Sequence, residues 1–113
     1  MDRLVQEDKA RNAVSVGKRV LDQWGDGLWY PASILGQVGN LFNVAFDDGD
    51  KADLPEARIR PLNWVVGSRV QCNWKSGGYY YSGTITTSNG LAVHISYDDG
   101  GQEDTSISKC RSR

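Results

Sequence analysis

Val16-Gly17-Lys18-Arg19-Val20 opens a pattern that continues with Trp24 and closes with Phe46-Asp47-Asp48-Gly49. The pattern returns as Val66-Gly67-Ser68-Arg69-Val70, Trp74 and Tyr97-Asp98-Asp99-Gly100. The offset is fifty residues from Trp24 to Trp74 and fifty-one from Phe46 to Tyr97, so one residue has been inserted after the second tryptophan. A repeat of this period makes each copy one supersecondary unit. Two copies are too few for a solenoid, and the sequence therefore predicts a pair of small domains.

Each copy has the pattern of several short strands joined by tight turns. In the first copy, strands are predicted at 19–24, 28–35, 41–46 and 51–54, with a single helical turn at 55–59. The second copy repeats the strands at 69–74, 78–86, 91–97 and 102–105, and Ile107 closes the unit. Four or five short strands in so few residues make a small, strongly bent antiparallel barrel. The predicted fold class is all-β, with two small antiparallel barrels in tandem.

The predicted domain boundaries follow from the repeat. Residues 1–14 are expected to be an N-terminal tail, because their few apolar residues form no full stripe. Barrel 1 is predicted at 15–62, a short linker at 63–65, barrel 2 at 66–110, and a C-terminal tail at 111–113. The linker is short and apolar, and we expect Trp64 to pack between the barrels and join them into one rigid unit. The predicted protein is a monomer.

The composition narrows the classes of partner. The chain has 113 residues, 39% hydrophobic and 24% charged, and no apolar run approaches the roughly 18 residues of a membrane span. Thirteen basic residues against fourteen acidic ones provide no surplus for nucleic-acid phosphates. The acidic residues instead gather in the two Asp-Asp-Gly loops, next to aromatic residues, which favours a cationic partner. Cys72 and Cys110 are expected to be free thiols, in a protein that stays inside the cell.

The sequence offers no catalytic site. The single histidine, His94, lies in a predicted strand, and no second histidine is present to form a metal site or to activate a cysteine. The glycines fall in turns between strands and not in a phosphate-binding loop. We therefore expect no enzymatic activity, no metal and no cofactor.

Several of these motifs resemble those of Tudor domains, chromatin-reader modules with an SH3-like barrel fold. In the first copy the resemblance is carried by Trp24, Asp26-Gly27, Tyr30, Phe46-Asp47-Asp48-Gly49 and Ile59-Arg60-Pro61-Leu62; in the second, by the segment 74–83 and Tyr97-Asp98-Asp99-Gly100. It extends over about residues 15 to 110 and implies a tandem Tudor module. It also implies a reader of methylated lysine on a histone or other protein tail, nuclear in a eukaryote and cytoplasmic otherwise, with methylated arginine as the second choice.

The aromatic residues of the motifs suit that ligand. A methylated ammonium keeps its charge but loses hydrogen-bond donors, so it is best held by the faces of several aromatic rings with the help of a carboxylate. The resemblance implies that these strand ends converge on one rim of each barrel. The predicted cage of barrel 2 consists of Trp74, Tyr79, Tyr81, Tyr97 and Asp99, and a second candidate cage in barrel 1 consists of Trp24, Tyr30, Phe46, Asp48 and Asp50.

We expect barrel 2 to have the better cage. Tyr79 and Tyr81 point the same way by strand alternation and can both flank Trp74, whereas Tyr80 points to the opposite face. A hydrogen bond to Asp99 needs an ammonium that keeps a proton, which favours mono- and dimethyl-lysine over trimethyl-lysine.

Some positions depart from the Tudor pattern and leave other functions open. Asp22 stands where the similar repeats have a small apolar residue; because burying an unpaired carboxylate is costly, we expect it near the rim or paired with Arg or Lys. Asp50 and Gly101 stand where a further cage aromatic would be. One alternative is a nucleic-acid binder that uses Lys18, Arg19, Lys75, Arg58 and Arg60 as phosphate contacts. The other is a protein-interaction scaffold with vestigial cages.

Overall fold

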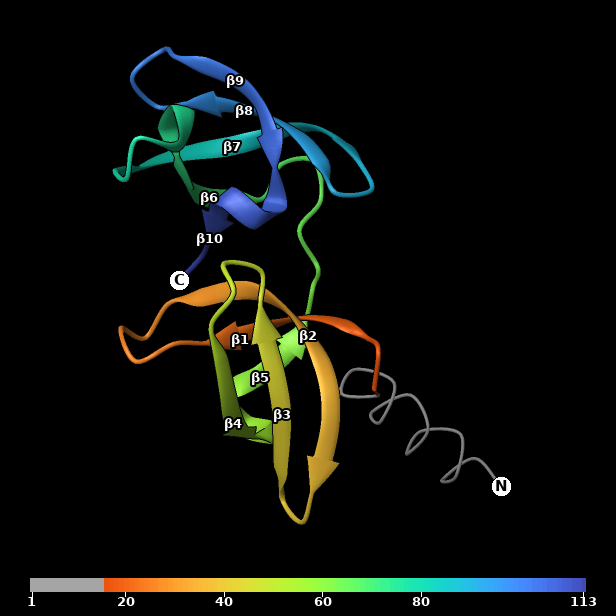
Figure 1. Cartoon of the computed structure of the whole chain (residues 1–113). Helices are drawn as coiled ribbons and strands as arrows, with labels where there is room; N and C mark the ends of the chain where they lie inside the picture. Colours follow the sequence, from red (N-terminus) through yellow and green to blue (C-terminus); the bar gives the residue numbers. More distant parts are fainter. Residues whose placement is uncertain (1–15) are drawn as a thin grey trace.

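The computed structural model describes residues 16–113, so the predicted N-terminal tail at 1–14 lies outside the described residues. The described chain forms two five-stranded antiparallel sheets, each bent into a small barrel (Figure 1). The predicted all-β fold class is confirmed. Barrel 1 contains the elements β1 (Arg19–Gln23), β2 (Trp29–Val38), β3 (Leu41–Phe46), β4 (Lys51–Pro55), the 3-10 turn η1 (Glu56–Arg58) and β5 (Ile59–Pro61).

Barrel 2 repeats this order of elements. They are β6 (Arg69–Asn73), the 3-10 turn η2 (Trp74–Ser76), β7 (Tyr80–Asn89), β8 (Ala92–Tyr97), β9 (Gln102–Ser106), the 3-10 turn η3 (Ile107–Lys109) and β10 (Cys110–Arg111). The strand order is β4-β3-β2-β1-β5 in one sheet and β9-β8-β7-β6-β10 in the other. The predicted strands are therefore confirmed in both copies, apart from their exact ends, and β5 and β10 are strands that the sequence did not predict.

The alternation of residues along the strands builds a separate core in each barrel. In barrel 1, Val20 lies opposite Ala32, which in turn lies opposite Phe46, and all three are buried. The long strands β2 and β7 each shift register at the same point of the repeat, between Ile34 and Gly36 and between Ile85 and Thr87. Such bulges bend a strand strongly, which lets a five-stranded sheet close on itself.

Cys72 and Cys110 form a disulfide, so the prediction of two free thiols is wrong. Both residues are buried, and they lie directly opposite each other on β6 and β10 with their Cα atoms 4.1 Å apart. The sequence analysis took Ile107 as the residue that closes the second copy and predicted no strand after it, so Cys110 was not expected to pair with Cys72. The disulfide attaches the C-terminal strand of barrel 2 to the strand that opens it.

Asp22 occupies the position in barrel 1 that Cys72 occupies in barrel 2, and its strand partner there is Ile59. Its exposed fraction is 0%, and neither carboxylate oxygen has a hydrogen-bond partner. The expectation that Asp22 lies near the rim or is paired with a basic residue is therefore wrong. Burial disfavours the charged carboxylate and raises the Asp22 pKa to about 7.

The two barrels meet through the C-terminal segment of barrel 2. Residues 111–113, expected to be a tail, instead run against barrel 1, as the C-terminus between the barrels in Figure 1 shows. Ser112 and Trp29 exchange two backbone hydrogen bonds, of 2.8 and 2.9 Å. Leu21 and Pro31 pair on the outer face of barrel 1 and are fully buried. The docking surface of barrel 1 is therefore the outer face of β1 and β2.

Trp64 contributes differently from the prediction. It is half-buried and packs against the core of barrel 2, together with Leu62 and Trp74. The linker therefore covers barrel 2, and the C-terminal segment makes the hydrogen-bonded junction. No helix within 16–113 is long and apolar enough to span a membrane.

Candidate functional site

Barrel 2 has a pocket of about 190 Å³ at the rim formed by η2 and the loop after β8. We call it the barrel 2 pocket; it is lined by Trp74, Tyr81, Tyr97, Asp99 and Gly101. The rings of Trp74 and Tyr97 meet edge to face, with centroids 5.3 Å apart and planes at 89°. Asp99 Oδ1 accepts a hydrogen bond of 2.9 Å from the backbone N–H of Gly101, which holds the carboxylate in the turn. Four of the five predicted cage residues therefore lie together.

Tyr79 is the predicted cage residue that the structure places elsewhere. Its exposed fraction is 74%, and it does not line the barrel 2 pocket. Strand alternation failed here because β7 begins at Tyr80, so Tyr79 belongs to the preceding loop. The additional ring on which we based the preference for barrel 2 is absent from the pocket.

Glu103, on β9, lies outside the barrel 2 pocket and stabilises two of its walls through hydrogen bonds. The sequence analysis did not identify it. One carboxylate oxygen accepts a hydrogen bond of 2.8 Å from the Tyr97 hydroxyl, and the other accepts one of 3.0 Å from the backbone N–H of Lys75. Burial first, and then the bond to Glu103, raise the Tyr97 pKa well above its ordinary value, so the phenol stays neutral. Lys75 and Ser76 have φ of 50° and 56°, so Glu103 holds a strained turn next to Trp74.

Barrel 1 has a matching pocket of about 180 Å³, which we call the barrel 1 pocket. It is lined by Trp24, Asp26, Tyr30, Phe46, Asp48, Asp50 and Tyr80. All five predicted residues of this cage therefore lie together, and Trp24 meets Phe46 edge to face with centroids 5.2 Å apart. Phe46, like Tyr97 in barrel 2, is also a core residue. The same positions of the repeat thus build both pockets.

Asp26 and Tyr80 are the lining residues of the barrel 1 pocket that the sequence analysis missed. Asp26 accepts a hydrogen bond of 2.6 Å from the Tyr30 hydroxyl and one of 2.8 Å from the backbone N–H of Leu28. Tyr80 comes from barrel 2, on the opposite face of β7 from Tyr81. The barrel 1 pocket therefore has four aromatic residues and three aspartates, against three aromatic residues and one aspartate in the barrel 2 pocket.

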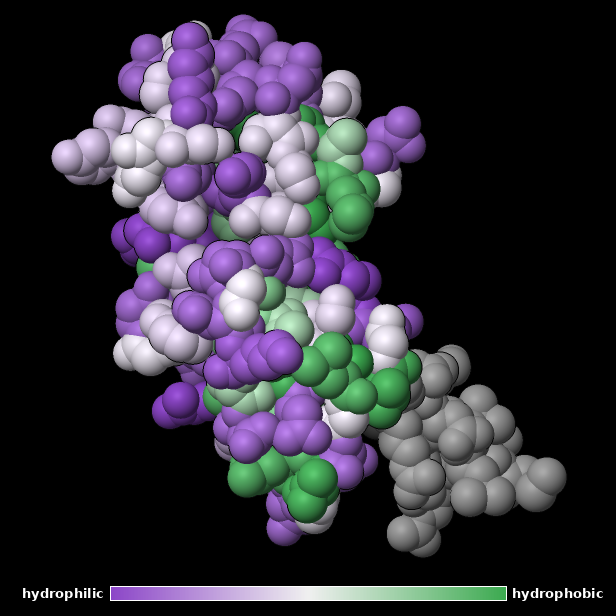
Figure 2. All heavy atoms as spheres, viewed as in Figure 1, coloured by the Kyte–Doolittle hydropathy of each residue, from purple (hydrophilic) through white to green (hydrophobic). Residues whose placement is uncertain are grey.

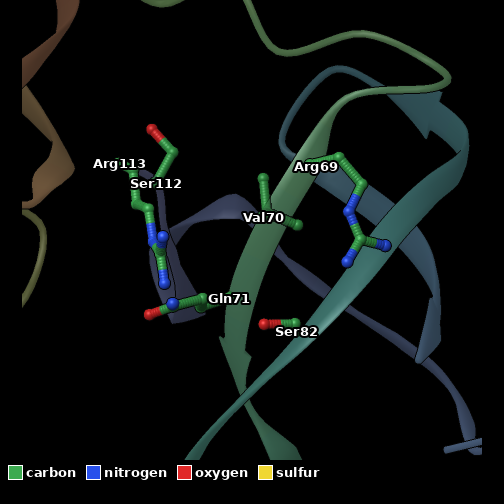
Figure 3. Close-up of a pocket in the computed structure, with 6 residues that line it drawn as sticks. All are labelled: Arg69, Val70, Gln71, Ser82, Ser112 and Arg113. Atoms are coloured by element: carbon green, nitrogen blue, oxygen red, sulfur yellow. The ribbon is translucent and has the colours of Figure 1, made fainter. Parts of the chain in front are cut away.

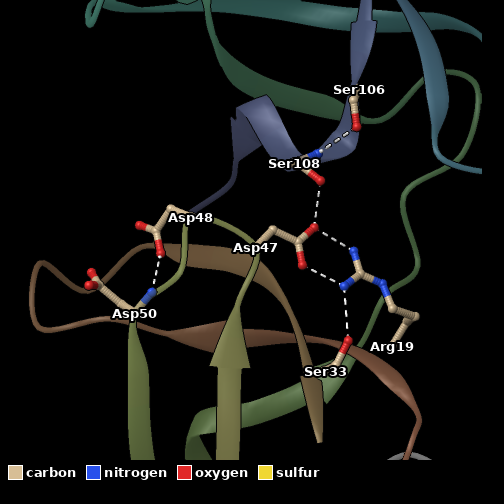
Figure 4. A network of polar contacts seen from close by, with 7 residues as sticks. All are labelled: Arg19, Ser33, Asp47, Asp48, Asp50, Ser106 and Ser108. Carbon is tan, nitrogen blue, oxygen red and sulfur yellow. Dashed lines mark hydrogen bonds and ion pairs between the residues drawn. The ribbon is translucent and has the colours of Figure 1, made fainter.

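The two aspartates of each Asp-Asp-Gly loop have different contacts. Asp47 forms a bidentate ion pair with Arg19 and accepts a hydrogen bond of 2.6 Å from the Ser108 hydroxyl of barrel 2 (Figure 4). Burial alone raises the Asp47 pKa, but the bonds from Arg19 and Ser108 lower it below its ordinary value. Asp98 pairs with Arg69 in the same way. The first aspartate anchors the loop, and the second one lines the pocket.

The basic residues proposed as phosphate contacts are partly engaged within the protein. Arg19 is paired with Asp47, and the Arg60 guanidinium lies 4.0 Å from the centre of the Trp29 ring and donates to the Arg113 carbonyl oxygen. The Lys75 ammonium lies 5.0 Å from the Trp74 ring. Within 16–113, no group of three metal-ligating side chains is placed to hold an ion.

A larger pocket, of about 460 Å³, lies on the side of barrel 2 that faces the C-terminal segment. Figure 3 shows its lining, which contains no aromatic ring: Arg69, Val70, Gln71, Ser82, Ser112 and Arg113. Because Arg69 is paired with Asp98, its charge is largely balanced. In Figure 2 the visible face is mainly hydrophilic, and apolar surface is confined to separate patches. The two aromatic pockets are therefore the better candidates for a site.

No family model matches the sequence, and neither does any curated protein. Among solved structures, the tandem Tudor domains of Crb2 match with a TM-score of 0.61 and 18% identity, over 87% of this chain and 84% of that one. Tandem Agenet domain 3-4 of ADCP1 matches with a TM-score of 0.46, 17% identity and coverage of 97% and 87%. The AGD34 segment of AGDP1 from Arabidopsis thaliana matches with a TM-score of 0.47 and 17% identity, over 97% of this chain and 89% of that one. The match to Crb2 shows that this chain has the fold of a tandem Tudor module.

Proposed function

We propose that this tandem Tudor-fold chain is a non-catalytic reader that binds methylated lysine on a protein tail. One observation carries the proposal: the repeat brings a tryptophan, a tyrosine, a third aromatic residue and an aspartate together in each barrel, around pockets of about 190 and 180 Å³. Core packing does not explain the arrangement, because Trp24 and Tyr81 keep exposed fractions of 41% and 46%. A histone tail is the proposed partner, and the nucleus of a eukaryotic cell the proposed location.

The pockets have a size suited to a methylated ammonium. At about 30 Å³ for each water-sized group, a pocket of this volume has room for roughly six such groups. That is enough for a dimethylammonium group and the methylene that bears it. The rings attract the cation through their negative faces, by about 0.5 to 2 kcal/mol for each well-placed ring.

The carboxylates favour a cation that keeps at least one proton. Asp99 in barrel 2 and Asp48 in barrel 1 line the pockets and can accept a charge-assisted hydrogen bond from mono- or dimethyl-lysine. Trimethyl-lysine has no proton to donate and leaves the carboxylate unsatisfied. The expected order of affinity is therefore mono- and dimethyl-lysine first, trimethyl-lysine next and unmodified lysine last, because its ammonium is the most strongly hydrated.

Nucleic-acid binding has less support. Arg19 and Arg60, two of the residues proposed for phosphate contacts, have intramolecular partners that would compete with phosphate. Methylated arginine remains the second choice of ligand, since a guanidinium already stacks on tyrosine in this protein, where Arg111 lies 3.9 Å from the Tyr80 ring centre.

Calorimetric titration of matched peptides in the unmodified and methylated states tests the proposal. Asp99→Asn and Asp48→Asn preserve shape and remove charge, so each should weaken binding at its own pocket by about 1 to 2 kcal/mol. Glu56→Gln, at an exposed residue of η1 outside both pockets, is the charge-matched control. Equal affinity for unmodified and dimethylated peptides would exclude methyl-lysine reading.

A further inference from the structure

We infer that the barrel 1 pocket is a composite cation site: Tyr80 of barrel 2 forms one wall, and Arg111 of barrel 2 positions the rings. This inference deepens the proposed function, on which its ligand class, a methylated ammonium, depends. The sequence repeat assigns each cage to one barrel, because each motif is contained within one copy. Of the two aromatic pockets, the barrel 2 pocket is lined by residues of its own barrel, whereas the lining of the barrel 1 pocket includes one residue from the other barrel.

Tyr80 reaches barrel 1 because of the alternation along β7. Its neighbour Tyr81 lines the barrel 2 pocket, so adjacent residues of one strand serve different pockets. Tyr80 pairs with Asn73 on β6, at the end of the sheet next to the pocket rim. It gives the barrel 1 pocket a fourth aromatic ring in place of the cage aromatic that Asp50 replaces in the sequence pattern.

Arg111 ties this ring to the rest of the pocket. Its guanidinium lies 3.9 Å from the centre of the Tyr80 ring and 5.9 Å from that of Tyr30. It donates a hydrogen bond of 3.0 Å to the Tyr30 hydroxyl, which itself donates to Asp26, and one of 2.9 Å to Gln71 on β6. Arg111 does not line the pocket. It therefore acts as a positioning residue that fixes Tyr80 against Tyr30.

The same segment docks the two barrels. Arg111 follows Cys110, which the disulfide holds to β6, and precedes Ser112, which pairs with Trp29. The site is therefore complete only when barrel 2 is docked on barrel 1. By linkage, a ligand that binds the complete site stabilises the docked arrangement. The positive charge of Arg111 near the site is offset by the three aspartates that line the pocket.

The test uses the full chain and the indole N–H signals of Trp24 and Trp74 in NMR spectra, which report the two pockets separately within one titration. The probes are a dimethyl-lysine peptide and tetramethylammonium chloride. Tyr80→Ala should weaken binding at Trp24 by about five-fold or more, the scale of one lost cation–π contact, and leave binding at Trp74 unchanged. Tyr80→Phe should restore it. Tyr79→Ala, at the exposed neighbouring tyrosine, is the matched control and should change neither signal.

Arg111→Lys tests the positioning role, because lysine keeps the charge but cannot stack on Tyr80 and bridge to Tyr30 and Gln71 at once. It should weaken binding at Trp24 by several-fold and shift the Trp29 signal at the barrel junction. A loss of folding would weaken both pockets alike, so binding at Trp74 separates the two effects. Binding at Trp24 that is equal in wild type, Tyr80→Ala and Arg111→Lys overturns the inference, as does a Trp24 signal that responds to neither probe. If tetramethylammonium binds with the expected dependence on Tyr80 but no peptide binds, the composite site holds and the reader function fails.

Discussion

The buried carboxylate of Asp22 predicts an unusual dependence of stability on pH. Asp22 is fully buried without a hydrogen-bond partner, and burial raises its pKa to about 7. Between pH 4 and 7 the side chain is therefore protonated in the folded protein and ionised in the unfolded chain, whose pKa is the ordinary 3.8. Unfolding then releases a proton, so raising the pH through this window favours the unfolded state.

The size of the effect follows from the two pKa values. The difference between about 7 and 3.8 corresponds to about 4 kcal/mol, since one pKa unit is worth about 1.4 kcal/mol. Asp22→Asn keeps the shape of the side chain and cannot ionise. The unfolding free energy of the variant relative to wild type should therefore rise by up to about 4 kcal/mol between pH 4 and 8, and change little above that.

Urea denaturation at half-unit pH steps, followed by tryptophan fluorescence, measures this difference. The other titrating groups are present in both proteins, so their contributions to the unfolding free energy cancel in the difference. Asp47 and Asp98, whose pKa values are lowered, change the unfolding free energy below pH 3.8. His94, whose pKa is raised by Asp104, changes it above pH 6.5. Glu56→Gln, at an exposed residue, provides the control. A difference between Asp22→Asn and wild type that stays constant from pH 4 to 8 would show that the Asp22 carboxyl group has the same pKa in the folded and the unfolded protein.

Three further variants or treatments test other parts of the account. Lys75→Glu should strengthen binding of a methyl-lysine peptide at the barrel 2 pocket by about two- to five-fold in low salt, because it removes a positive charge from the face of the Trp74 ring. Binding of a nucleic acid would instead become weaker. Glu103→Gln should weaken the same pocket and lower the Tyr97 pKa, seen by ultraviolet titration, although burial keeps it above the ordinary value. Reduction of the disulfide between Cys72 and Cys110, which closes a separation of 38 residues, should lower the unfolding free energy by about 4 kcal/mol in denaturant titrations; an unchanged midpoint would show that the bond does not stabilise the fold.

Sequence reasoning identified most of the fold because the local signals agree with the tertiary structure. Alternating residues and Asp-Asp-Gly turns fixed the strands in both copies, and the coincidence of Trp24, Tyr30 and Phe46 with an aspartate indicated a pocket that the structure brings together. These signals all come from residues of the same barrel. Because the pattern recurs in two copies, each copy supports the interpretation of the other.

Features that depend on contacts between distant segments could not be predicted in the same way. Alternation placed Tyr80 on the opposite face from Tyr81, but only the docking of the barrels shows that this face meets barrel 1. β10 has only two residues and no periodicity to read, so the pairing of Cys110 with Cys72 was missed. Asp22 lies in a strand that was predicted correctly, but the usual cost of burying a carboxylate led to the wrong expectation about its surroundings.

Whether the two aromatic pockets hold a methylated lysine can be measured by NMR, which shows which protein protons lie next to the methyl groups of a bound peptide. A dimethyl-lysine peptide with ¹³C-labelled N-methyl groups should show intermolecular nuclear Overhauser effects to the rings of Trp74 and Tyr81, and to those of Trp24, Tyr30 and Tyr80. We expect these contacts at both pockets and no saturable binding of the unmodified peptide at the same concentration. Methyl contacts that fall only outside the two pockets, or an unmodified peptide that binds equally well, would contradict this expectation.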